Sequence, residues 1–162
     1  MILTVFTFVH VVISLIGIGA GVVVMAGFLA GKQLTGWTAW FLWSTVLTSA
    51  TGYFFPYHGF KPSYVVGAIS LVFLALALFA LYRVQLAGAW RKTYVISAMI
   101  ALYLNVFVLI AQLFDKVPAL RALAPTQSEP PFKITQLTVL VLFFILTIFS
   151  AIRFRSTSVR TA

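Results

Sequence analysis

The chain consists largely of long apolar runs that charged side chains almost never interrupt. Of its 162 residues, 62% are hydrophobic and 8% are charged, whereas a typical soluble domain has about 25% charged residues. A transmembrane β-barrel would instead alternate apolar and polar residues over strands of about 10 residues. We therefore expect an all-α fold, a transmembrane helical bundle embedded in the lipid bilayer.

Five apolar segments reach the length of about 20 residues that a helix needs to cross a bilayer. They predict a single transmembrane domain over residues 1–162, with spans at about 3–29, 37–55, 64–82, 93–114 and 134–152. The loop at 115–133 is the one long connection, and its apolar content predicts an ordered cover over the end of the bundle. Its prolines predict that residues 125–131 are not regular helix.

The basic residues divide unequally between the two sides of this arrangement. Seven lie on the side of the C-terminus and four on the other: Lys32, Arg83, Arg91, Lys92, Arg153, Arg155 and Arg160 against Lys61, Lys116, Arg121 and Lys133. Cytoplasmic loops of membrane proteins carry the excess of Lys and Arg. We therefore expect the N-terminus outside and the C-terminus in the cytoplasm. The net charge of +9 is then a topology signal, and we expect no nucleic-acid partner.

With this topology, the titratable and amide side chains gather toward the outer side. Both histidines and both acids of the chain lie there: His10, His58, Asp115 and Glu129. Asn105, Gln112 and Asp115 follow at spacings of seven and three residues, which places them on one helix face. Polar side chains in a membrane turn toward protein or water, because hydrocarbon offers them no partner. The sequence thus predicts a polar pocket that faces the extracytoplasmic side.

Three kinds of ligand fit such a pocket. A haem b would take His10 and His58 as axial imidazoles, with Asn105 and Gln112 beside it. A transition metal would be bound by His10, His58 and Asp115. A small amphiphile would be bound with His10 as a titrating group beside Asn105 and Gln112. We predict no catalytic residue, because nothing resembles a nucleophile–base pair or a nucleotide-binding loop, and whether the protein is an enzyme stays open.

The same residues also have structural explanations. His10, Asn105 and Gln112 are the kind of side chain that hydrogen-bonds across helix interfaces, and Gly17 and Gly21 form a small-residue pair that allows close helix approach. This interpretation favours a non-catalytic accessory or assembly subunit, whose apolar surface meets a second copy or a partner in a membrane complex. A third alternative is a small transporter or channel that uses the polar face of the fourth span.

Three parts of the chain resemble small, uncharacterised bacterial integral-membrane proteins. They are TGYFFPYHGFKPS at 51–63, the fourth span around ALYLNVFV at 101–108, and KVPAL at 116–120 with LAPTQSEPPF at 123–132. The resemblance covers about half of the chain and implies a multi-pass protein of the bacterial inner (cytoplasmic) membrane. It implies no activity, cofactor or functional residue.

Overall fold

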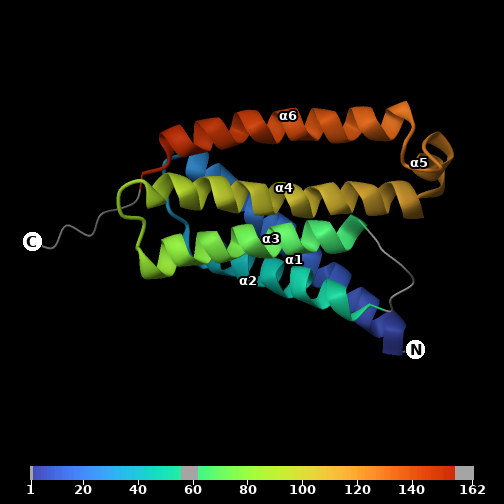
Figure 1. Cartoon of the computed structure of the whole chain (residues 1–162), viewed down its shortest axis with the longest axis horizontal. Helices are drawn as coiled ribbons and strands as arrows, with labels where there is room; N and C mark the ends of the chain where they lie inside the picture. The colour runs from blue at the N-terminus through green and yellow to red at the C-terminus, as the bar shows by residue number, and fades with distance from the viewer. Residues whose placement is uncertain (1, 56–61, 156–162) are drawn as a thin grey trace, which may run out of the picture.

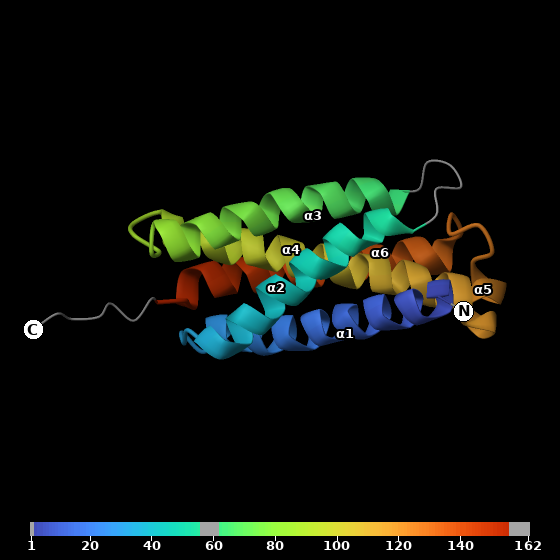
Figure 2. The ribbon, with the colours of Figure 1, turned by 90° about the horizontal axis from the view of Figure 1, so that it is seen from below.

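The computed structural model describes residues 2–55 and 62–155, which contain helices and no strand. Five helices lie lengthwise beside one another (Figures 1 and 2): α1 (Ile2–Leu29), α2 (Thr35–Thr51), α3 (Pro62–Leu78), α4 (Trp90–Lys116) and α6 (Pro130–Arg153). The short α5 (Pro118–Leu123) lies at the end of the bundle where α1 begins. The all-α prediction is confirmed.

Four of these helices are long and apolar enough to cross a membrane. They are α1, α4, α6 and the helix made by α3 together with its π-helical continuation, Phe79–Arg83. The chain thus has the character of a multi-pass membrane protein. The second predicted span is shorter, because α2 has 17 residues before a 3₁₀ turn, Gly52–Phe54, continues it.

The predicted outer loop is more helical than its proline content indicates. α4 continues to Lys116, α5 occupies the middle of the loop, and α6 begins at Pro130. The prediction that residues 125–131 exclude regular helix is therefore wrong for Pro130 and Pro131. These prolines stand in the first turn of α6, where a helix leaves its backbone N–H groups unbonded and a proline loses nothing.

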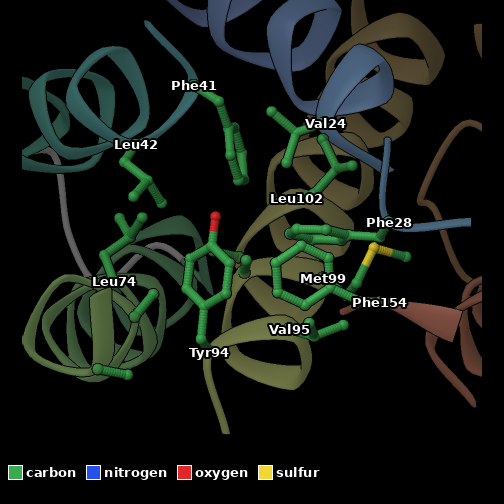
Figure 3. Close-up of a cluster of buried hydrophobic side chains, with 14 of the residues drawn as sticks. Val24, Phe28, Phe41, Leu42, Leu74, Tyr94, Val95, Met99, Leu102 and Phe154 are labelled. Atoms are coloured by element: carbon green, nitrogen blue, oxygen red, sulfur yellow. The ribbon is translucent and has the colours of Figure 1, made fainter. Parts of the chain in front are cut away.

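The larger of the two buried hydrophobic clusters among the described residues lies toward the end of the bundle that carries most of the basic residues. Figure 3 shows large buried side chains from α1, α2, α3 and α4, and from the residue after α6, meeting there: Val24, Phe28, Phe41, Leu42, Leu74, Tyr94, Val95, Met99, Leu102 and Phe154. The ring of Phe28 packs edge-on against Tyr94 at 5.5 Å and against Phe154 at 4.9 Å. Because Phe154 directly follows α6, this cluster fastens the end of α6 to α1 and α4.

Two glycines of α1 let α2 and α4 approach closely. A Cβ atom at Gly21 would lie 2.5 Å from Leu102 Cδ1 and 2.9 Å from Phe41 Cδ2. A Cβ at Gly17 would lie 2.9 Å from Ser44 Oγ. At both positions a Cβ would force a neighbouring side chain to shift, which agrees with the predicted role of this small-residue pair in helix packing.

Candidate functional site

His10 lies toward the end of the bundle where α1 begins, and a single hydrogen bond joins it to α2. Its Nδ1 lies 2.9 Å from Thr51 Oγ1, and that hydroxyl in turn donates to the Leu47 carbonyl oxygen at 2.6 Å. Because the hydroxyl proton is used on the backbone, Thr51 accepts from His10 and the ring proton sits on Nδ1. Nε2 of the neutral imidazole is then left with a lone pair and has no hydrogen bond to residues 2–55 or 62–155.

Aromatic side chains fix the orientation of the His10 ring. Phe55 stands edge-on to it, with ring centroids 5.0 Å apart and an interplanar angle of 90°. Phe55 also contacts Phe6, one turn away from His10 on α1, at 4.9 Å. A Cβ at Gly52 would lie 3.9 Å from His10 Cε1, so a side chain at this position would be in van der Waals contact with the ring. His10 is partly buried and points at the end of α2.

Asn105 makes a separate polar contact deeper in the bundle. Its Nδ2 donates to Thr45 Oγ1 at 3.5 Å, a long bond between α4 and α2. The same amide lies opposite Gly17, where a Cβ would be 3.5 Å away. Gly17 follows His10 by seven residues on α1, about 10 Å along the helix. Asn105 therefore lies about two helical turns further along the bundle than His10. Its amide is hydrogen-bonded to α2 and not to His10.

Of the remaining predicted site residues, two are exposed and one lies outside the residues that the structure describes. Gln112 is exposed, and Asp115 forms an exposed ion pair with Lys116 at 3.4 Å. His58 lies outside the described residues. Within residues 2–55 and 62–155, no three His, Asp or Glu side chains come together in a way that could hold a metal ion. Among the described residues, His10 is hydrogen-bonded to Thr51, and no hydrogen bond joins it to Asn105, Gln112 or Asp115.

The loop between α5 and α6 is tied together by Glu129. Its carboxylate accepts from the Thr126 hydroxyl at 2.7 Å, from the Thr126 amide at 3.2 Å and from the Ser128 amide at 3.1 Å. The Thr126 hydroxyl, followed by the backbone amides, holds the pKa of Glu129 below its usual range. Gln127, with a left-handed φ of 57°, donates to the Ala111 carbonyl of α4 at 2.8 Å. The ordered cover therefore forms over α4 and α6.

Sequence reasoning missed two polar partners. Thr51 was part of a resembling segment but was not assigned to His10; the available signal was its depth, close to the outer end of its own span. Gln136 is buried on α6, where its amide donates to the Phe107 carbonyl at 3.1 Å and its Oε1 has no hydrogen-bond partner among the described residues. Comparisons of the chain with protein-family models, curated proteins and solved structures give no match.

Proposed function

We propose that the chain crosses the bacterial cytoplasmic membrane five times, with its N-terminus outside. α2 and its 3₁₀ continuation, 17 and 3 residues, measure about 31 Å, close to the about 30 Å of a hydrocarbon core. α1 begins and α6 ends at opposite ends of the bundle, as an odd number of crossings requires (Figure 1). The end where α6 stops carries six of the nine described basic residues, against three at the other end. The excess favours the cytoplasm for that end.

Single-cysteine variants test this topology cleanly, because the chain has no cysteine of its own. Ser128→Cys, in the loop before α6, is expected to react in intact cells with a thiol reagent that does not cross membranes. Ala87→Cys, in the α3–α4 turn, is expected to react only after lysis. The reverse pattern would contradict the orientation, and reaction of both variants in intact cells would contradict a crossing of the membrane by α4.

Within this topology, the protein binds a small ligand near the extracytoplasmic surface through His10. The observation that carries this proposal is the contact of His10 Nδ1 with a Thr51 hydroxyl that donates to the Leu47 carbonyl. We infer from it that the Nδ1–H is fixed on Thr51 and that the Nε2 lone pair remains for a ligand. Metal-ligating histidines are typically held in this way, with the second ring nitrogen donating to a protein oxygen. The same lone pair accepts a hydrogen bond from a hydroxyl group.

The chemistry of the described residues narrows the choice of ligand. A metal ion held by side chains alone needs more donors than the described residues bring to His10. A haem with an axial His10 imidazole, or a hydroxyl-bearing amphiphile such as a quinol, needs only one fixed imidazole and apolar surroundings. Phe6 and Phe55 provide those surroundings. Whether His58 supplies a second axial ligand is part of the haem proposal.

The test combines absorbance, metal analysis and binding of decylubiquinol to the purified protein. A haem predicts a Soret band that is lost in H10A, and also in H58A if both histidines are axial ligands. A quinol site predicts saturable decylubiquinol binding that H10A abolishes and T51V weakens, because T51V releases the ring. T7V is the control, since Thr7 bonds only the Leu3 carbonyl of its own helix. A colourless protein that binds decylubiquinol no better than H10A would overturn the proposal.

A second candidate function, that of an accessory or assembly subunit, is favoured by the surface of α2. Trp37, Trp40 and Trp43 are 51%, 65% and 53% exposed, a large aromatic surface without cover from the described chain. Sedimentation of W40A and W43A in detergent tests whether a second copy covers it, with the equally exposed Phe144→Ala on α6 as control. Loss of a dimer in the tryptophan variants alone would support a self-associating subunit. A monomeric wild type and monomeric variants would rule out a self-associating subunit.

A further inference from the structure

An apolar groove of about 430 Å³ lies between α4 and α6, toward the end of the bundle opposite His10. Its floor includes the buried Met99 and Phe143, and exposed aliphatic residues such as Ile96 and Ile148 form its walls. Lys92, in the first turn of α4, is the one charged side chain among the described residues that line it. The groove therefore combines a long hydrocarbon surface with a cation at one end.

The length of the groove matches one leaflet of a bilayer. On α4 the lining runs from Lys92 to Tyr103, which is about 16 Å along the helix axis. On α6 it runs from Leu140 to Ile152, about 18 Å. Half of a hydrocarbon core is about 15 Å thick. A lipid acyl chain lying in this groove would thus extend from the membrane surface at Lys92 to the middle of the bilayer.

No described side chain offers an anion to Lys92. The sequence contains two acidic residues, and both lie far from Lys92: Asp115 is at the opposite end of α4, and Glu129 immediately precedes α6. Asp115 is paired with Lys116, and Glu129 accepts hydrogen bonds from Thr126. The first turn of α4 has no acidic residue and no side-chain cap, so no side chain offsets the positive end of the helix dipole there.

We propose that this groove binds an anionic phospholipid, with one acyl chain between α4 and α6 and the headgroup phosphate at Lys92. A zwitterionic lipid would fill the groove but would offset its phosphate with its own cation. A second copy of the chain would bring another +9 of net charge to a basic surface, which disfavours that occupant. Anionic lipids of the cytoplasmic leaflet are attracted to basic residues at the membrane surface, and the predicted orientation places Lys92 there.

Native mass spectrometry of the full chain, released from micelles with phosphatidylglycerol or phosphatidylcholine of equal chain length, tests the proposal. We expect one phosphatidylglycerol to be retained about five-fold more tightly than phosphatidylcholine, the size of effect that one basic residue has at a membrane surface. K92Q should remove this preference, and K133Q, at the opposite end on α6, should keep it. Dihexanoyl phosphatidylglycerol, which has the headgroup but short chains, should be retained poorly.

A second pair of variants tests the groove rather than the charge. Thr147→Trp places a large side chain in the groove and is expected to lower retention of both long-chain lipids. Thr138→Trp, an exposed position on α6 outside the groove, is the matched control. The proposal would be overturned if the wild type retained the two lipids equally, or if K92Q kept the preference for phosphatidylglycerol. It would also be overturned if T147W retained lipid as well as T138W does. A dimer that forms in place of the lipid complex would overturn it as well.

Discussion

Replacing Gly21 by alanine tests whether close approach of α1 to α2 and α4 sets the stability of the bundle. The new Cβ would lie 2.5 Å from Leu102 Cδ1 and 2.9 Å from Phe41 Cδ2. Non-bonded carbons prefer about 3.5–4.0 Å, so the closer contact is about 1 Å too short. Leu102 and Phe41 are each 1% exposed and cannot swing out into lipid. Overpacking of a core costs about 1–3 kcal/mol, and we expect a loss of about 2 kcal/mol in the free energy of unfolding.

Gly19→Ala is the matched control for this change. Gly19 lies on the same helix two residues away, and a Cβ there would meet nothing within 4 Å. Both variants make the same chemical change inside α1, so any effect of alanine on helix propensity largely cancels between them. We expect G19A to stay within about 0.5 kcal/mol of the wild type. The difference between the two variants then measures the steric contact of Gly21.

The assay is unfolding in mixed micelles with increasing sodium dodecyl sulfate, followed by far-ultraviolet circular dichroism. We expect a lower midpoint for G21A at an unchanged slope, and a G19A curve close to that of the wild type. Leu102→Val in the G21A background makes room for the new methyl group, so the double variant should be more stable than the sum of the single effects. Equal midpoints for G21A and G19A would refute the packing argument.

Three further predictions concern polar contacts. Because the pKa of Glu129 is lowered, its contribution to loop order is present above the usual value of 4.5 and is lost as the pH falls through the lowered pKa. The protection factor of the Thr126 amide against hydrogen exchange should fall over that range, whereas in E129Q it should be low at every pH. N105L gives up a long bond to Thr45 and should lose about 0.6 kcal/mol in the same unfolding assay; a loss above about 2 kcal/mol would contradict this. Q136L loses the bond to Phe107 but removes an unbonded buried oxygen, so its midpoint should barely change.

The positions of the helices could be predicted from the sequence because hydrocarbon leaves the backbone few alternatives. An uninterrupted apolar run must bond its own backbone groups, and a helix does this within one segment. The predicted spans 3–29 and 93–114 accordingly match α1 and α4 to within three residues at each end. The start of α6 at Pro130 was not predicted, because proline is usually counted as a residue that ends a helix. Its effect depends on which turn of the helix it occupies.

The candidate site was harder to predict, because the face that a helix turns to its neighbours changes along its length. Tyr94, Ala98, Asn105 and Gln112 share one face by spacing, and the first two are buried as that face predicts. Further along α4, Asn105 is partly buried and Gln112 is exposed. Helices that cross at an angle stay in contact over only part of their length. The crossing angle cannot be calculated from the spacing of polar residues along one helix, so the length of the contact could not be predicted.

The sequence by itself determined that this chain is a bundle of membrane-length helices with its cations concentrated at one end. Both properties follow from how each residue partitions between lipid and water, which depends little on its neighbours. Only the tertiary structure decided that His10 meets Thr51, that Lys92 stands at the end of an apolar groove, and that the larger buried hydrophobic cluster lies toward the basic end. These are pairings between helices, and small residues such as Gly17 and Gly21 set them by allowing two backbones to approach at one place and not at another.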